Sequence, residues 1–383
     1  MQTRIIFKWM GAFKILAIAF LIAGIITSCK KDNQISPASP EQAGNEQAAV
    51  NTARQLEQNA AINAQKEAEA LGFTANSSTN REQKNIVEIA VSNPAFSSLV
   101  AAVVKTGLAG ALSNPNSNLT VFAPTNGAFA QLPAPFNNAA NISNINDAAQ
   151  IDFLRSVLLY HVLGAEVFSY QINNGSSSAT TIKPAGSSND NTLYFSKNLG
   201  LLRVNGQTDV IFPNVNASNG VIHVVNKVLL FPTNTIAGIA IADANFSSLV
   251  AALVKTNLAG VFVGSGDFTV FAPTNAAFAQ LPAPFNNAAN INNINDAAQI
   301  AALGNILRYH VVASRTFTWD LGILRRVTTL ADAPKNKITT ILGYNTGWVK
   351  GDDNNSFTQI NPGDILATNG VVHVISKVLL PKN

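Results

Sequence analysis

The chain has 383 residues, of which 47% are hydrophobic, 8% are aromatic and 12% are charged, and its formal net charge is +4. This length allows two or more domains with cores of their own. The few charges form no basic stripe interleaved with aromatic residues, which argues against a nucleic acid as partner, and the single cysteine excludes a disulfide within the chain.

Residues 1–28 predict a secretory signal peptide. They carry Arg4, Lys8 and Lys14, no acidic residue, and an apolar run of 12 residues from Ile15 to Ile26. A membrane-spanning helix needs about 20 such residues, so a permanent transmembrane anchor is the weaker interpretation. Removal of the three basic residues leaves 22 Lys and Arg against 21 Asp and Glu, so the processed chain is close to neutral.

The end of this segment resembles a bacterial lipobox. The residues are Ile26-Thr27-Ser28-Cys29, and in a lipobox the peptide is cut before the cysteine, which is then acylated. We therefore predict lipidation at Cys29 and attachment to the membrane, because several acyl chains on one residue hold a protein stably. The charged cluster at 30–32 favours the outer membrane and the cell surface, with the periplasmic face as the alternative.

Residues 29–82 are predicted to form a tether. The segment is rich in Gln, Asn, Ala, Ser and Glu and has almost no aromatic residues. Between residues 46 and 71 it has good helix formers but few large apolar side chains, so we expect a helix that frays or docks weakly. An extended tether of about 50 residues would hold the rest of the chain well clear of a membrane.

The remainder of the chain is a tandem duplication. Residues 120–151 recur at 269–300 with two changes in 32 positions, and 96–110 and 219–230 recur at 246–260 and 369–380. A period of about 150 residues is the size of a whole domain, so each copy should have its own core. We predict two domains, a first copy at 83–232 and a second copy at 233–383.

Each copy shows the same order of predicted elements. In the first copy, helical apolar spacing within 86–108 precedes a short strand at 120–123, a helix at 128–132 capped by Thr125-Asn126, and a helix at 146–162 that runs into a strand. From about 180 to 230, β-branched runs alternate with Gly- and Asn-rich loops, and Asn219-Gly220 supplies a turn before the last strand. Helices that come first and strands that cluster later predict an α+β fold with a twisted, mostly antiparallel sheet and packed helices.

Three motifs recur in both copies in the same order. The first copy has TVFAPTN from Thr120, LLYHV from Leu158 and NGVIHVVNKVLL from Asn219. Together they resemble the fasciclin domain, and the resemblance covers most of the chain. It implies a compact β wedge with several helices, used in extracellular adhesion and in matrix or polysaccharide association, without cofactor or catalysis. Between the Tyr-His motif and the last strand the copies diverge, and we expect this region to set the partner of each.

The four histidines occupy matched positions. His161 and His310 each follow a tyrosine, and His223 and His373 lie in the predicted last strand. A pair of imidazoles could bind zinc or copper, or act as acid and base. However, no third ligand lies nearby in sequence, and the apolar flanks favour buried rings whose nitrogens are satisfied by the backbone or by a nearby Asn or Asp. We therefore predict no metal and no cofactor site.

The resemblance implies a second role for the Tyr-His motifs. Tyr160, His161, Tyr309 and His310 fall where the family has been implicated in receptor and matrix contact, so they are candidate interaction residues. The alternative is that so apolar a motif belongs to the core.

The loop from Lys350 offers two further motifs. Lys350-Gly351-Asp352 matches an integrin-binding tripeptide, although a match of three residues arises easily by chance. Asp352 and Asp353, with the two asparagines that follow, are oxygen ligands of the kind that Ca²⁺ takes, but the loop lacks the spaced ladder of an EF-hand. Both remain weak candidates.

The sequence contains no motif for catalysis: it has no G-x-S-x-G, no H-E-x-x-H, no phosphate loop and no dinucleotide fingerprint. The leading hypothesis is therefore a non-enzymatic, lipid-anchored surface protein that binds extracellular protein or polysaccharide, with weak self-association. The alternative is an envelope module that binds an apolar small ligand such as a pigment or lipid. A third hypothesis, a hydrolase built on the paired histidines, predicts stoichiometric metal in the purified protein.

Overall fold

The computed structural model describes residues 55, 58–59, 62–72 and 84–382, apart from 187–189, 199, 263, 265, 344 and 345. The predicted signal peptide, Cys29 and most of the predicted tether lie outside these residues. Residues 52–383 form one compact unit, which contains both copies.

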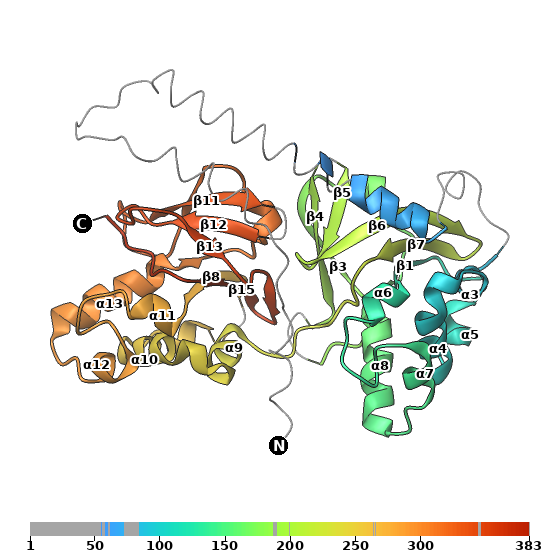
Figure 1. Cartoon of the computed structure of the whole chain (residues 1–383), viewed down its shortest axis with the longest axis horizontal. Coiled ribbons are helices and arrows are strands. Elements are labelled where there is room, and N and C mark those ends of the chain that lie inside the picture. The colour runs from blue at the N-terminus through green and yellow to red at the C-terminus, as the bar shows by residue number, and fades with distance from the viewer. Residues whose placement is uncertain are drawn as a thin grey trace. The chain divides into compact units, whose positions relative to one another are not determined.

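Short helices, several of them capped by a side chain, make up most of the first half of the first copy (Figure 1). At Asn85 a capping box opens the first helix, because the Asn85 side chain accepts from Glu88 N and the Glu88 side chain accepts from Asn85 N. The predicted Thr125 cap is confirmed, since its hydroxyl accepts from Ala128 N at 3.2 Å. The helices are α3 (Ile86–Ser92), η2 (Pro94–Phe96), α4 (Ser97–Lys105), α5 (Ala109–Leu112), α6 (Asn126–Phe129), α7 (Ala139–Ser143), α8 (Ala148–Tyr160) and η3 (Ser169–Gln171).

The first copy has a seven-stranded sheet in the order β2-β1-β7-β6-β5-β4-β3. Among the described strands of this copy, β1 and β7 pair in parallel, with Leu119 beside Gly220, and the other neighbours are antiparallel. The predicted α+β fold with a mostly antiparallel sheet is confirmed. The strands are β1 (Leu119–Pro124), β2 (Val162–Leu163), β3 (Gly175–Thr180), β4 (Thr192–Asn198), β5 (Leu201–Val204), β6 (Thr208–Ala217) and β7 (Gly220–Val225).

The central strands of this sheet are buried on both faces. On β1, Val121 and Ala123 join a core that includes Phe96 of the helical layer, whereas Phe122 joins a second core on the opposite face. All six positions of β7 are buried. This explains why both strands are nearly continuous apolar runs instead of alternating apolar and polar residues.

The second copy repeats this plan with an eight-stranded sheet in the order β10-β11-β12-β13-β15-β8-β9, in which β14 also pairs with β15. The central pair, β8 and β15, is again parallel. Where the first copy has the single bulged strand β6, the second has the two short strands β13 and β14. The elements are α9 (Ile236–Ala242), η4 (Ala244–Phe246), α10 (Ser247–Lys255), η5 (Ala259–Phe262), β8 (Phe268–Pro273), α11 (Asn275–Phe278), α12 (Ala288–Asn292), α13 (Ala297–Tyr309), β9 (Val311–Val312), η6 (Thr318–Asp320), β10 (Arg325–Thr328), β11 (Lys337–Gly343), β12 (Thr346–Lys350), β13 (Thr358–Ile360), β14 (Ile365–Ala367) and β15 (Gly370–Ile375).

Asn219 joins three separate segments of the first copy. Its Nδ2 donates to the carbonyl oxygens of Leu112 at 2.8 Å and Asn114 at 3.2 Å, and its Oδ1 accepts from Ile86 N at 2.9 Å. The side chain is fully buried, and Asn369 makes the corresponding bonds in the second copy. The Asn-Gly pair therefore does more than form the predicted turn, because it fixes the helices to the last strand.

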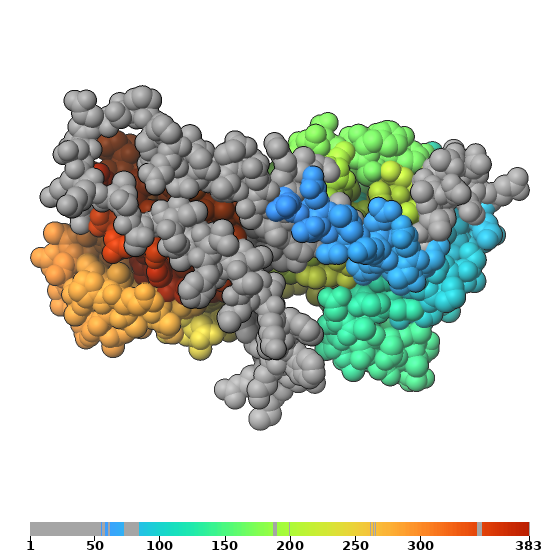
Figure 2. Space-filling view, turned by 45° about the horizontal axis from the view of Figure 1, so that its top comes forward, coloured from blue at the N-terminus to red at the C-terminus, as the bar shows by residue number. Residues whose placement is uncertain are grey.

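Part of the predicted tether packs on the first copy. Residues 62–70 are helical, and Ala68, which is 1% exposed, belongs to the core that also contains Phe96. Ala64 of the same helix lines a space together with Ile211 and Phe212 of β6. Figure 2 shows this segment in blue against the first copy. The helix thus docks through its small side chains, in line with the sequence, which gave it few large apolar residues.

Replacing Ala68 with Arg is expected to release this helix, because a long charged side chain does not fit a buried alanine position. Amide hydrogen exchange of residues 62–70 should then become fast, while exchange in α8 and β7 stays slow. Ala70→Arg is the matched control, since Ala70 lies on the exposed side of the same helix. Equal protection in both variants would show that the helix does not depend on this contact.

Among the described residues, no single helix is long and apolar enough to cross a membrane. Two pairs of consecutive helices reach that length together, but each pair is bent by more than 100° between its members.

Candidate functional site

The Tyr-His motif of the first copy is buried where α8 ends. Tyr160 is 0% exposed and His161 is 2% exposed. The Tyr160 hydroxyl donates to the carbonyl oxygen of Thr192 at 2.7 Å. His161 Nδ1 lies 2.7 Å from the carbonyl oxygen of Val157, and its Nε2 accepts from Leu229 N at 2.8 Å. The ring is therefore neutral, with its proton on Nδ1, and it holds the C-terminal segment against the helix.

The second copy repeats this arrangement. Tyr309 Oη donates to the carbonyl oxygen of Lys337, His310 Nδ1 lies 2.7 Å from Ile306 O, and His310 Nε2 accepts from Leu379 N at 2.8 Å. Both residues are as buried as their counterparts. All four candidate interaction residues are thus buried in the core and hydrogen-bonded there. Their role in adhesion stays a prediction.

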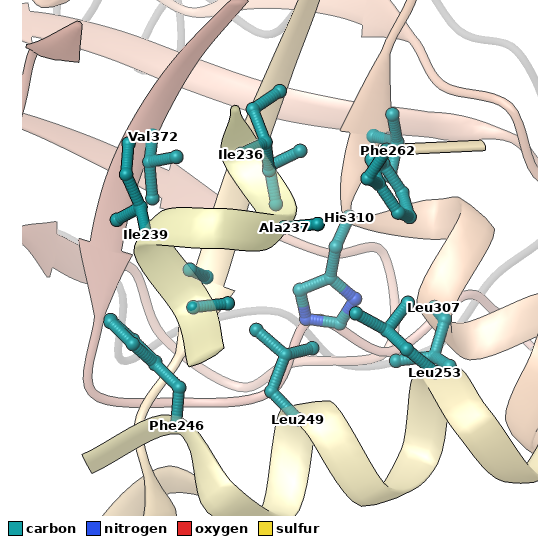
Figure 3. A pocket seen from close by; sticks show the side chains of 14 residues that line it. Ile236, Ala237, Ile239, Phe246, Leu249, Leu253, Phe262, Leu307, His310 and Val372 are labelled. Atoms are coloured by element: carbon teal, nitrogen blue, oxygen red, sulfur yellow. The ribbon is translucent and has the colours of Figure 1, made fainter. Parts of the chain in front are cut away.

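His310 lies against a small apolar cavity. Figure 3 shows its ring among side chains from α9, α10 and α13, including Ile236, Leu249, Leu253 and Leu307. Burial lowers the pKa of His310 to about 4, which keeps the ring neutral at physiological pH. The cavity holds about 20 Å³, whereas binding sites for drug-sized ligands typically hold about 300 Å³ or more. This space does not accommodate a pigment or a lipid.

The other two histidines are also bonded to the backbone. His223 Nε2 donates to Val167 O at 2.9 Å, and its Nδ1 accepts from Asn214 N at 3.1 Å. His373 makes the same pair of bonds with Thr316 O and Asp364 N. The prediction of buried, backbone-satisfied rings is confirmed. Within the part of the chain that the structure describes, no three His, Cys, Asp or Glu side chains cluster as metal ligands.

The loop after Lys350 uses its polar groups internally. Arg326 binds the Asp352 carboxylate through both of its terminal nitrogens. Asn354 Oδ1 accepts from the backbone nitrogens of Gly351 and Leu380. These bonds engage Asp352, the acid of the integrin-like tripeptide, and Asn354, so two of the four proposed calcium ligands are already bonded within the chain and the structure gives neither candidate any support.

A row of aromatic rings lies beside the Tyr-His motif of the first copy. We call Phe136, Phe153 and Phe231 the aromatic row. The ring centroids of Phe136 and Phe153 are 5.6 Å apart, and those of Phe153 and Phe231 are 5.9 Å apart. Phe153 is 42% exposed. Below the row, Tyr160 meets the Phe231 ring edge-on at 6.0 Å, and Lys183 Nζ lies 4.5 Å from the same ring centroid. The buried motif thus supports a partly exposed aromatic surface.

The duplication does not preserve this row. The positions equivalent to Phe153 and Phe231 are Ala302 and Pro381, and only Phe285 remains. Sequence reasoning missed the row because its members lie far apart in the chain. A comparison of the two copies on the outer face of α8 would have singled out Phe153, since a large apolar side chain on an exposed helical face needs an explanation.

Comparisons with known proteins place both copies in one family. A model of the Fasciclin domain matches residues 94–231 and 244–381. Transforming growth factor-beta-induced protein ig-h3 of Sus scrofa is 29% identical over 275 residues, which cover 70% of this chain and 35% of that protein. Protein sll1483 of Synechocystis sp. is 40% identical over 147 residues, which cover 38% of this chain and 73% of that protein. The chain thus spans about a third of the length of the ig-h3 relative.

A search of solved structures matches a FAS1 domain pair from the insect cell adhesion molecule fasciclin I. The match covers 75% of this chain and 97% of that chain, with 17% sequence identity and a TM-score of 0.35.

Proposed function

This chain belongs to the fasciclin domain family, and from that premise we propose that it is a non-enzymatic surface protein for adhesion to other cells, matrix protein or polysaccharide. The family is known for cell adhesion and interaction with the extracellular matrix. The buried, neutral histidines leave no acid and base pair in the motif that both copies share. The shared motif therefore serves the fold, and we assign the contact to the surface above it.

The aromatic row is the observation that carries this proposal. Its exposed member, Phe153, continues into Phe136 and Phe231, so flat apolar ring faces adjoin one another. Such faces suit sugar rings or the apolar side chains of a protein partner. Since the second copy lacks the row, we expect the first copy to make the main contact.

The Tyr-His motifs act indirectly in this proposal. Tyr160 supports Phe231, and its hydroxyl ties α8 to β4 through Thr192. A substitution at Tyr160 or His161 would therefore disturb the row without either residue touching the partner. In the second copy, Tyr309 and His310 have the same supporting bonds but no row above them.

Attachment to the membrane is the second part of the proposal. The predicted signal peptide and the lipobox at Cys29 support a lipid anchor in the outer membrane, with the domains on the cell surface. The alternative location is the periplasmic face. A tether between Cys29 and the first copy leaves the domains room to reach a partner.

The apolar-ligand alternative lacks an equivalent observation. The cavity beside His310 holds about 20 Å³, and a larger space lined by Ala64, Leu202 and Phe212 holds about 210 Å³, so both are smaller than a typical site for a drug-sized ligand. Colour or bound lipid in the purified protein would still favour that alternative, because ligands can open a site that is closed in the free protein.

Protease treatment of intact cells tests the proposed location. We expect release of a fragment that carries both copies, detected by antibody, and we expect Cys29→Ser to abolish membrane attachment of the protein. An unprocessed precursor in the cytoplasm would contradict the proposal. Protection of the fragment until the outer membrane is opened would instead place the domains in the periplasm, where they could not serve cell-surface adhesion.

A further inference from the structure

Residues of the first copy cover the η6 segment of the second. The Arg203 guanidinium lies 4.6 Å from the Trp319 ring centroid, Asn198 Nδ2 donates to Trp319 O at 3.2 Å, and Ser196 Oγ donates to Asp320 Oδ2 at 2.7 Å. Trp319 is consequently 1% exposed. The strands β4 and β5 thus bury the most hydrophobic side chain of η6 and bond to its polar neighbours.

A second set of contacts surrounds the first. Gln207 Nε2 donates to Gly363 O at 2.9 Å, and Tyr194 lies 6.1 Å from the Phe317 ring between centroids. A Cβ atom added at Gly206 would stand 2.5 Å from Phe317, so the backbone approaches this ring as closely as glycine allows. These contacts come from the part of the first copy between its Tyr-His motif and its last strand, where the two copies diverge in sequence. That part of the first copy therefore has the second copy as its partner.

Because the chain is duplicated, the covered segment also occurs in the first copy. There, η3 carries Phe168 and Tyr170 at the positions of Phe317 and Trp319, one repeat of 149 residues earlier. The two rings stack with centroids 5.3 Å apart and an interplanar angle of 11°. Tyr170 is 72% exposed. We call this pair the η3 surface; it has the local structure of the buried η6 segment, but it is open.

The covering face also recurs, in the second copy. On β4 and β5 the covering residues Ser196 and Arg203 are direct cross-strand partners, and Ile341 and Trp348 are partners at the same register on β11 and β12. The neighbouring position Val349 points into the core, whereas Ile341 and Trp348 are half-buried on the opposite face. We call this pair the β11–β12 face. This face is more apolar than the pair Ser196 and Arg203 of the first copy. It therefore matches the aromatic η3 surface in character.

We propose that the β11–β12 face of one molecule docks on the η3 surface of another, in the way that the first copy covers the second within a chain. The contact joins two different surfaces, so a pair of molecules still has one free η3 surface and one free β11–β12 face, and chains can grow head to tail. An aromatic side chain at the centre of such a contact dominates its affinity. The proposal goes beyond the proposed function and stands on geometry that is independent of the lipid anchor.

Sedimentation of the chain from residue 29 onward, carrying Cys29→Ser, tests this proposal. We expect the average mass to rise with concentration. Tyr170→Asp removes the η3 surface and Trp348→Asp removes the β11–β12 face, and each should weaken association roughly tenfold or more. Ile241→Asp, at a side chain that is 72% exposed elsewhere, is the matched control and should associate normally.

A mixture of the two variants gives the sharpest result. Each variant keeps the surface that the other lacks, so the mixture should form dimers and nothing larger. A contact between identical surfaces would not be restored by mixing. Thermal unfolding of each variant confirms that it is folded, and Ile341→Asp replaces Trp348→Asp if the latter is not. A wild-type chain that stays monomeric, folded variants that associate normally, or a mixture that stays monomeric would overturn the proposal.

Discussion

Acidification from pH 6.5 to pH 4 is expected to destabilise both copies strongly. Burial lowers the pKa of His161, His223 and His310 from 6.5 to about 4, and it lowers the pKa of His373 as well. All four rings are neutral in the folded chain, where a ring nitrogen of each accepts a hydrogen bond from a backbone N–H. A proton on that nitrogen would break the bond and leave a charge in the core.

The sign of the effect follows from proton binding. Below pH 6.5 the histidines of the unfolded chain bind protons, whereas those of the folded chain stay neutral. The free energy of unfolding therefore decreases as the pH is lowered, until the folded histidines titrate near pH 4. Each of the three histidines with a pKa of about 4 contributes about 3 kcal/mol to this loss. Asp320 opposes the trend, because burial raises its pKa above 3.8 and its carboxyl group therefore binds a proton more readily in the folded chain.

Urea unfolding in steps from neutral pH to pH 4 measures this loss. His223→Gln is the informative variant, since an amide can donate to Val167 O and accept from Asn214 N without titrating in the window. We expect a shallower dependence of the unfolding free energy on pH in this variant. A wild-type free energy that does not change between pH 6.5 and pH 4 would contradict the assignment of buried neutral rings.

Replacing Gly220 with alanine is expected to disrupt the first copy. Gly220 begins β7 with φ at 149°, paired in parallel with Leu119 of β1. A Cβ atom at this position would stand 2.0 Å from Leu119 O and 2.7 Å from Leu119 N. The two central strands cannot separate without breaking both cores, so we expect a loss of about 3 to 5 kcal/mol in the free energy of unfolding.

Gly107→Ala is the matched control for this clash. Gly107 also has a positive φ, +70°, but a Cβ atom there would meet nothing within 4 Å. Backbone strain alone should cost about 1 to 2 kcal/mol. Chemical unfolding of both variants separates the two effects, and equal losses would show that the close approach of β1 and β7 is not what requires glycine at residue 220.

The sequence predicted the local structure of each copy well. Thr125 caps α6 as expected, and α8 runs into β2 at the Tyr-His motif. Residues close in sequence decide such features, through capping side chains and apolar spacing. The neighbour of β1 was harder to foresee, because an apolar run shows that a strand is buried but not which distant strand lies beside it.

The candidate surfaces depend on contacts of still longer range. Phe136, Phe153 and Phe231 share no sequence period, and only folding brings their rings together. Divergence between the copies did mark the segment that carries Arg203, but it gave no sign that Trp319 of the same chain is its partner. A pattern that repeats in sequence predicts a shared fold, whereas the differences between repeats indicate where the copies have separate roles.

Attachment of cells to surfaces coated with matrix protein or polysaccharide tests the adhesion proposal most directly. The informative variant is Phe153→Ala, which gives the first copy the alanine that the second copy has at Ala302. Val104→Ala is the control, since Val104 is a 67% exposed side chain on α4. We predict that cells with the wild-type protein or Val104→Ala attach and that cells with Phe153→Ala, at equal surface amounts, attach far less. Equal attachment by all three, or by cells that lack the protein, would contradict the account.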